Sequence, residues 1–184
     1  MKPVQHYEKA DIKNIEANFS SNKTHRFSLT VPFLERDNNN TICIIGQNPS
    51  KADEYVADKT LHYLERYVFE KLPQYSNLIM LNLYTRIDTN KDKTTGLHDP
   101  AYTEYLKTVI SNNSDFLIVF GEVKNEGAYK FTIKAQEIKE ALKSKNVFKL
   151  NLQGAQYAPH PGNPKILYNN INLDITKYDF TDIN

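Results

Sequence analysis

Polar side chains follow the first strongly apolar run of the sequence, at a point where many α/β proteins bind a ligand. The run Thr41–Ile45 is rich in β-branched residues, which predicts a buried strand. The residues that follow it directly are Gly46, Gln47, Asn48, Pro49 and Ser50. Ligands bind beyond the carboxyl ends of parallel strands, although the same residue types also form ordinary turns. This cluster could therefore hydrogen-bond a planar polar ligand through its amides and its hydroxyl.

Two more polar residues occupy comparable points further along the chain. Asn82 lies inside or at the end of the strand predicted from the apolar run Leu78–Leu83, where asparagine is disfavoured and a buried amide needs hydrogen-bond partners. It either contacts a ligand or caps a neighbouring loop. His160 lies between Pro159 and Pro161, which stiffen the backbone on both sides. An imidazole in such a loop could act as an acid, a base or an electrostatic stabiliser near neutral pH.

The other chemistry-bearing residue types restrict the kinds of reaction. The sequence has one cysteine, Cys43, which lies inside a predicted strand. A single cysteine excludes an intramolecular disulfide and argues against a cysteine-held zinc or iron–sulfur site. The sequence has no phosphate-binding glycine-rich loop, no paired carboxylates and no nucleophile elbow. We therefore expect neither a metal nor a cofactor.

The elements that must position these residues alternate between strand and helix. The apolar runs are Thr41–Ile45, Leu78–Leu83, Phe116–Phe120 and Val147–Leu152. The segments with helical spacing are Thr60–Leu72, Pro100–Ile110 after the N-cap candidate Asp99, and Ala128–Lys145. This alternation favours right-handed βαβ units. It predicts an α/β protein: a three-layer α/β/α sandwich with a central, mainly parallel sheet of four strands.

The two ends of the sequence are less regular. The spacing of Ile12, Ile15 and Phe19 predicts a helix, and Arg26–Phe33 reads as an edge strand or a lead-in because it contains Pro32. The tail from about residue 170 alternates polar and apolar residues, which fits a late edge strand or a loosely packed tail.

Length and composition indicate an ordinary globular protein. The 184 residues suggest one domain, 1–184, with its core at about 26–170. We expect a cytoplasmic protein, because the sequence has neither an apolar stretch that could cross a bilayer nor a signal peptide pattern. We also expect it to be a monomer. The net charge of +1 does not by itself indicate a nucleic-acid partner, which usually requires a basic surplus.

The order of the motifs resembles that of the uracil-DNA glycosylase superfamily over roughly residues 41–168. Gly46–Pro49 is similar to its first motif, a strand followed by Gly-Gln-Asp-Pro or Gly-x-Asn-Pro. Leu81-Asn82 is similar to the end of its uracil-reading strand, and Phe120-Gly121 to its aromatic–glycine pair. His160–Pro164 matches its His-Pro-Ser-Pro motif in part. A family of bacterial and phage proteins with Asn-Pro-Ser, Asn-Leu and His-Pro motifs in this order is similar as well.

The resemblance implies an enzyme that flips uracil, or a related deaminated base, out of DNA and hydrolyses its N-glycosidic bond. Asn82 would contact the pyrimidine edge, and neutral His160 would donate to the oxygen that gains negative charge. Asn48 stands where some members carry aspartate, so it would only orient the water, which predicts slow turnover. The other residues of the implied pocket are Gly46, Gln47 and Ser50.

The same resemblance implies contacts with DNA outside the pocket. Lys51 and Lys165 are candidates for phosphate contacts, and Ile166 for an apolar wedge between bases, although Ile166 could equally bury a short helix. The candidates for a base-stacking aromatic are Tyr55, Tyr63 and Tyr84, each of which also fits a packing role. The near-neutral charge favours a single-stranded or weakly bound substrate.

Two other functions fit the same residues. A non-catalytic module that binds a nucleobase or a nucleic acid would account for Asn48 in place of aspartate and for the altered loop after His160. A nucleoside hydrolase or transferase is the third possibility, because a fold does not determine a function.

Overall fold

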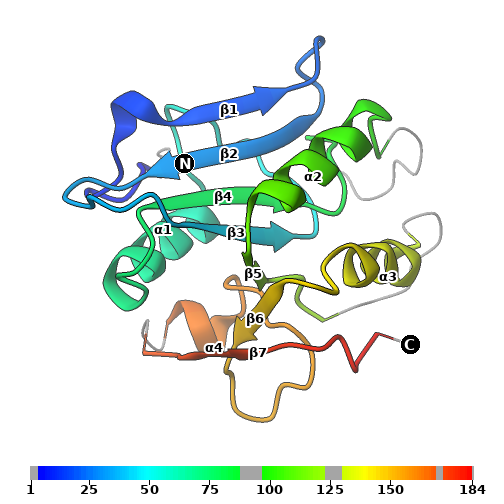
Figure 1. Ribbon diagram of the computed structural model, residues 1–184. Helices are drawn as coiled ribbons and strands as arrows, with labels where there is room; N and C mark the ends of the chain where they lie inside the picture. The colour runs from blue at the N-terminus through cyan, green and yellow to red at the C-terminus, as the bar shows by residue number, and fades with distance from the viewer. Residues whose placement is uncertain (1–3, 88–96, 123–129, 169–171, 184) are drawn as a thin grey trace.

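The computed structural model describes residues 4–87, 97–122, 130–168 and 172–183. Within these ranges the chain forms an α/β fold of seven strands, four helices and one 3₁₀ turn (Figure 1). The strands are β1 (Glu16–Phe19), β2 (Arg26–Pro32), β3 (Thr41–Gly46), β4 (Asn77–Asn82), β5 (Asp115–Ile118), β6 (Asn146–Leu150) and β7 (Ile175–Lys177). The helices are α1 (Lys59–Lys71), α2 (Ala101–Asn112), α3 (Phe131–Ala141) and α4 (Pro164–Leu167), and the 3₁₀ turn is η1 (Ile12–Asn14).

All strands of the described residues belong to one sheet, in the order β1-β2-β4-β3-β5-β6-β7. The apolar runs of the sequence form its centre, because β4, β3, β5 and β6 are parallel to one another. Antiparallel pairings add β1 and β2 on one side and β7 on the other. The expectation of four mainly parallel strands was therefore wrong in size: the described sheet has seven strands, and half of its pairings are antiparallel.

Strand β2 is internal, not the expected edge strand or lead-in, because it lies between β1 and β4. Pro32, which suggested an edge position, is the last residue of β2 and lies beyond the part that pairs with β1, so its missing N–H interrupts no bond to that strand. Since β2 runs antiparallel to β4, its first residue, Arg26, lies at the edge of the sheet where β4 ends at Asn82.

The segment around Ile12, Ile15 and Phe19 is not the expected helix. It forms η1 and then β1, in which Glu16 pairs with Thr30 of β2. The buried side chain of Ile15 joins the core from the residue between the two elements. Pairing with β2 therefore overrides the helical spacing, as tertiary contacts commonly do for short apolar patterns.

The predicted helices agree with the structure apart from their ends. Helix α1 lies within one residue of the expected range. Helix α2 begins at Ala101, one residue later than expected, and Asp99 accepts a hydrogen bond from Ala101 N at 2.9 Å. Helix α3 is shorter than expected, and residues 128–129 of the expected helix lie outside the described ranges. In the tail, the structure shows the edge strand rather than a loosely packed segment, because β7 pairs with β6 at the end of the sheet. Residues 170–171 of the tail lie outside the described ranges.

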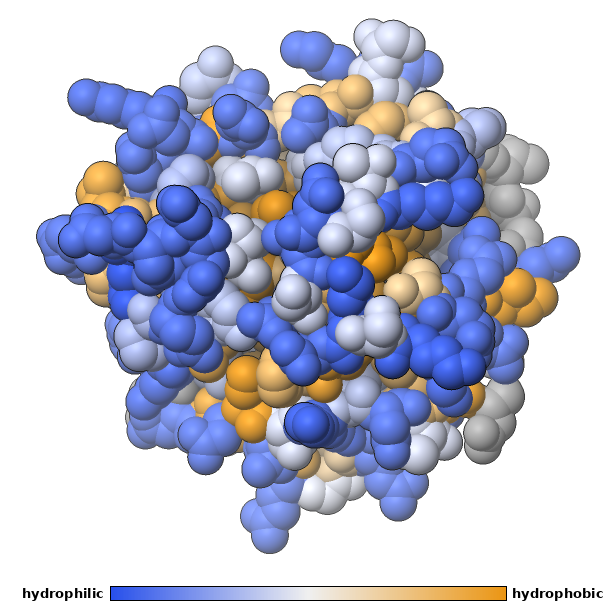
Figure 2. All heavy atoms as spheres, in the orientation of Figure 1, coloured by the Kyte–Doolittle hydropathy of each residue, from blue (hydrophilic) through white to orange (hydrophobic). Residues whose placement is uncertain are grey.

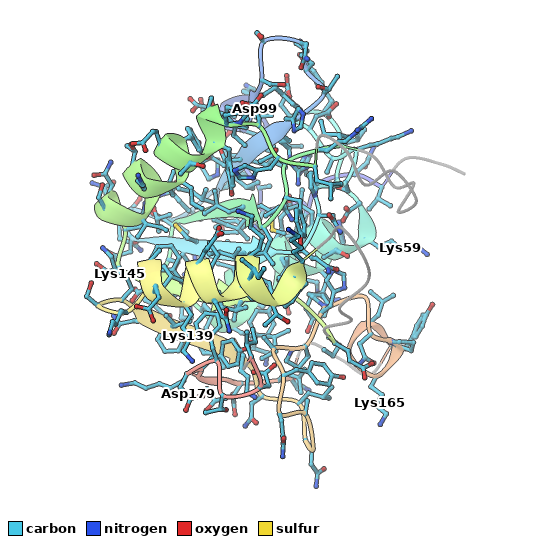
Figure 3. The ribbon with its side chains drawn as sticks, turned by 90° about the vertical axis from the view of Figure 1, so that its right-hand side faces the viewer. Lys59, Asp99, Lys139, Lys145, Lys165 and Asp179 are labelled. Carbon is cyan, nitrogen blue, oxygen red and sulfur yellow. The ribbon has the colours of Figure 1, made fainter. Side chains whose placement is uncertain are left out.

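The sheet has a hydrophobic core on each face. Helices α1 and α4 pack on one face, where Leu64 and Ile166 join the core with Ile44 of β3. Helices α2 and α3 pack on the other, where Ile138 joins Ile45 of β3. Figure 3, which views the molecule from its right-hand side, shows the two pairs of helices on opposite sides of the strands. The face of the molecule drawn in Figure 2 carries mostly polar residues, with small apolar patches between them. None of the described helices has the length and apolarity that a membrane crossing requires.

A buried ion pair joins the N-terminal segment to α1. His6 Nδ1 lies 2.6 Å from Glu65 Oε1, and both side chains are almost fully buried. Tyr7 N donates to Glu65 Oε2 at 2.7 Å, and His6 Nε2 lies 2.9 Å from the backbone oxygen of Asp53. Burial disfavours the charged imidazole, but the hydrogen bond and the charge of Glu65 outweigh it and raise the pKa of His6 above its ordinary 6.5.

Candidate functional site

The carboxyl ends of β3 and β4 meet the starts of β2 and α1 and the loop before α4 around a small polar cavity. Its volume is about 50 Å³. Its lining residues are Arg26, Gly46, Gln47, Asn48, Ser50, Asp58, Thr60, Leu61, Met80, Asn82 and His160. The fold therefore brings together the polar residues that end β3, the one that ends β4, and the Pro-flanked histidine. A volume of this size holds one or two water molecules or the polar edge of a ligand.

Larger hollows lie elsewhere on the described part of the chain, but their lining residues are less suited to binding a polar ligand. One of about 360 Å³ lies between α3, β6 and β7 and is rimmed by flexible lysines such as Lys143 and Lys177. Another of about 250 Å³ lies between α2 and α3 and is mostly apolar. A third, of about 500 Å³, lies between the N-terminal segment and α1, and several of its polar side chains are already paired: His6 with Glu65, and Arg66 and Tyr7 with Glu70. We take the polar cavity as the candidate site because it brings two almost fully buried polar side chains, Arg26 and Asn82, together with His160.

Gly46 lets the amide of Asn82 lie against β3. The two residues pair directly across the parallel strands. A Cβ at Gly46 would lie 2.9 Å from Asn82 Nδ2 and 2.8 Å from Met80 Cε, closer than real Cβ contacts occur. Asn82 is 3% exposed, and Tyr102 donates a hydrogen bond from its hydroxyl to the backbone oxygen of Asn82 at 2.7 Å. Asn82 is thus held in a fixed position, with its side chain in the cavity.

Arg26 is the first of two site residues that the sequence analysis missed. Its side chain is 3% exposed. Nη1 donates to the backbone oxygen of Ala52 at 2.6 Å, and Nη2 to Asn82 Oδ1 at 3.4 Å. Arg26 Nε and Asn82 Nδ2 are buried and have no hydrogen-bond partner among the described residues. Two buried donors without acceptors therefore line the same cavity.

The turn after His160 determines which ring nitrogen can donate. Gly162 N donates to His160 Nδ1 at 2.9 Å, so the proton of the neutral ring lies on Nε2. A Cβ at Gly162 would lie 2.8 Å from Nδ1, so this approach requires glycine. Gly121, at a φ of +81°, packs against the base of the His160 side chain, since a Cβ there would lie 3.0 Å from His160 Cβ. Burial lowers the pKa of His160, and the charge of Asp58 partly offsets this.

Asp58 is the second site residue that the sequence analysis missed. It caps α1, because its Oδ1 accepts a hydrogen bond from Leu61 N at 2.7 Å. Its half-buried carboxylate lines the polar cavity and acts electrostatically on both His160 and Arg26. An N-cap aspartate directly before the apolar spacing of α1 was the available signal, because helices that follow parallel strands begin at the ligand-binding edge.

The residues after β3 shape one wall of the cavity. The backbone oxygen of Gln47 accepts a hydrogen bond from Tyr84 N at 3.1 Å, which ties this loop to the residues after β4, and Gln47 lines the cavity. Ser50 Oγ accepts from Ala52 N at 3.1 Å, so this hydroxyl helps to form the turn. Asn48 is half-buried and lines the cavity, with no acidic group of its own to offer.

Some of the residues expected to contact DNA are exposed in the structure, and others are buried. Lys51 and Lys165 are exposed. Figure 3 shows Lys165 and Lys59 on the same side of the molecule, away from Lys139. Ile166 is fully buried, so it has no surface with which to wedge between bases and instead buries α4. Of the three tyrosines considered for stacking, Tyr63 and Tyr84 are buried, and Tyr55 is 77% exposed.

The arrangement is suited to binding a group that accepts hydrogen bonds. Asn82 Nδ2, Arg26 Nε and His160 Nε2 supply donors, and Asp58 supplies one carboxylate. Among the described residues, no cluster of three or more His, Cys, Asp or Glu side chains could hold a metal ion.

A family model matches residues 26–162, and the family is described as "Protein of unknown function (DUF1643)". This span contains every residue that lines the polar cavity, from Arg26 to His160. No curated protein and no solved structure matches the chain significantly. Because the matched span covers well over half of the 184 residues, the chain belongs to the DUF1643 family.

Proposed function

We propose that the protein is a DNA glycosylase that hydrolyses the N-glycosidic bond of uracil or of a related deaminated base. The observation that carries this proposal is the pair of buried donors without acceptors in the polar cavity, Asn82 Nδ2 and Arg26 Nε, beside His160, whose neutral ring carries its proton on Nε2. The polar edge of a deaminated base carries keto oxygens, which are acceptors. The parallel centre of the sheet, with helices on both faces and the motifs at its strand ends, supports a glycosylase-like three-layer fold.

The reaction would proceed by departure of the base as an anion. Breaking the glycosidic bond leaves positive charge on the sugar and negative charge on the base. His160 Nε2–H would donate to the oxygen that gains this charge, and the turn at Gly162 holds the ring in the required tautomer. The lowered pKa keeps the ring neutral near pH 7, so it acts as a hydrogen-bond donor.

Asp58 supplies the carboxylate that Asn48 cannot. An amide is not a base at neutral pH, so Asn48 would only orient the attacking water. The Asp58 carboxylate, which lines the same cavity, would stabilise the cationic sugar and accept the proton of the water. The base leaves first, with the electron pair of the broken bond, and the hydroxyl formed from the water then bonds to the cationic sugar carbon. The proton taken up by Asp58 finally passes to the solvent or to the released base anion.

The substrate would be DNA with an accessible base. The cavity of about 50 Å³ admits the edge of a base, so the loops that carry Ser50 and His160 would separate further when a whole ring enters. Exposed Lys51 and Lys165 would contact phosphates, and Tyr55 would offer a stacking surface. The net charge of +1 favours single-stranded over tightly bound duplex DNA.

A cleavage assay tests the proposal. Single- and double-stranded oligonucleotides with one uracil are incubated with the protein, treated with alkali and separated on a gel. We expect cleavage at uracil, with strong losses in His160→Ala and Asn48→Ala. His62→Ala on α1 and Asn112→Ala on α2 are matched controls outside the cavity and should retain activity. A folded protein that cleaves no uracil, hypoxanthine or xanthine substrate would contradict the proposal. Activity on free nucleosides alone would favour a nucleoside hydrolase, and base binding alone a non-catalytic module.

A further inference from the structure

A buried guanidinium without a carboxylate partner forms one wall of the polar cavity. Burial lowers the pKa of Arg26 to about 10, against the attraction of Asp58 and Asp53, so the group remains charged at neutral pH. Within the described ranges, Arg26 takes part in no salt bridge. Burying a cation that no carboxylate contacts directly costs stability. Its presence in a cavity wall therefore needs an explanation at the site.

The contact between Arg26 and Asn82 determines which way the amide points. A guanidinium has hydrogen-bond donors only. The atom of Asn82 that faces Nη2 at 3.4 Å must therefore be its oxygen, Oδ1, because the amide nitrogen would place donor against donor. The second Arg26 contact, to the backbone oxygen of Ala52 at 2.6 Å, holds the guanidinium in place. The NH₂ group of Asn82 is then left without a partner in the described residues.

We infer that Arg26 is a positioning residue that fixes the Asn82 amide with its NH₂ group toward the ligand, and that the cavity thereby selects a keto group over an amino group. This inference rests on the proposed function in taking the ligand to be a base. A keto oxygen accepts from Asn82 Nδ2, and Arg26 Nε offers a second donor in the same cavity. An exocyclic amino group would instead place its own N–H donors against those of Asn82 and Arg26 and leave buried donors unpaired. Buried sites built from donors strongly reject a ligand that lacks the matching acceptor.

Binding of free bases tests the inference separately from cleavage. The probes are 1-methyluracil and 1-methylcytosine, which differ at the keto or amino group, titrated into ¹⁵N-labelled protein by NMR. Arg26→Lys keeps a cation that only donates, and Arg26→Met keeps the bulk without any donor. We expect wild type and Arg26→Lys to bind 1-methyluracil at least about tenfold more tightly than 1-methylcytosine. In Arg26→Met the amide can turn, so this ratio should fall to near one.

The outcomes separate the inference from the proposed function. If Arg26 had only a structural role, Arg26→Met would lower the affinity for both bases by the same factor. An unchanged affinity ratio in Arg26→Met would therefore overturn the inference, while the proposed function, uracil cleavage, would still stand. Keto selectivity that depends on Arg26 would support the inference even in a protein that cleaves no DNA. If Arg26→Met does not fold, wild type decides: the Asn82 side-chain NH₂ signals should shift with 1-methyluracil and not with 1-methylcytosine. Equal shifts, or binding of neither base, would overturn it.

Discussion

Replacing Asp58 separates two roles that this side chain has in the structure. Its Oδ1 caps α1 by accepting a hydrogen bond from Leu61 N at 2.7 Å. Its carboxylate also lines the polar cavity. Asparagine keeps an acceptor for the cap but not the charge, whereas alanine removes both. Asp58→Asn and Asp58→Ala therefore form a matched pair, in which stability reports the cap and activity reports the charge.

The two variants should differ in stability and agree in activity. Asp58→Ala should lower the free energy of unfolding by about 1 kcal/mol through the lost cap. Asp58→Asn should lower it by less, about 0.5 kcal/mol, because the cap remains and the loss is the attraction of the charge to the helix N-terminus and to Arg26. Both should reduce the rate of uracil release about 10²- to 10³-fold, the range for removing one group that stabilises transition-state charge. Urea denaturation and single-turnover cleavage measure the two quantities.

A pH profile tests the same assignment through His160. Burial lowers the pKa of His160 and Asp58 raises it, so removing the charge of Asp58 should lower that pKa further. The neutral, donating ring then persists to lower pH, and the acid limb of the rate profile should move to lower pH in Asp58→Asn. An Asp58→Asn protein with wild-type activity and an unmoved acid limb would refute the electrostatic role. Equal losses of stability in the two variants would refute the difference in capping.

Three further substitutions test the packing around the site and the N-terminal segment. Gly46→Ala would place a Cβ 2.8 Å from Met80 Cε, which can move, and 2.9 Å from Asn82 Nδ2. The free energy of unfolding should fall by about 1 kcal/mol and the cleavage rate by about 10²-fold. Unchanged cleavage would contradict this packing. Gly162→Ala would crowd Nδ1 of His160 at 2.8 Å and should reduce cleavage without unfolding the chain, as circular dichroism and the gel assay would show. His6→Ala leaves the buried carboxylate of Glu65 without its charged partner and should cost about 3 kcal/mol in urea denaturation at pH 6. Because the pKa of His6 is raised from 6.5 in the folded chain, the contribution of the protonated ring is complete below pH 6.5 and declines as the pH rises through the raised value; a cost that does not depend on pH would contradict the ion pair.

The centre of the sheet and part of the site could be predicted because both depend on local sequence. The β-branched run Thr41–Ile45 predicts a buried strand, and the polar residues that follow it must then lie at the ligand-binding edge. Asn82 and His160 follow the same logic, and the structure places both at the same cavity.

Arg26 could not be found in this way, because its position depends on a long-range pairing. Nothing local shows that its strand runs antiparallel to β4 and so begins where β4 ends. The misassigned helix around Ile15 has the same origin, since only the pairing of β1 with β2 decides between helix and strand there. Residues brought to a site by antiparallel neighbours need knowledge of the sheet order, which periodicity does not contain.

The buried cysteine of β3 has a practical consequence for measuring substrate binding. Cys43 is fully buried, and burial raises the pKa of its thiol to about 12, so it should not react with maleimide reagents in the folded protein. It is also the only cysteine in the sequence. A cysteine introduced at Tyr168, which is 76% exposed just after α4, would therefore be labelled selectively. A fluorophore there would report on oligonucleotide binding beside the His160 loop, with the native thiol left in place.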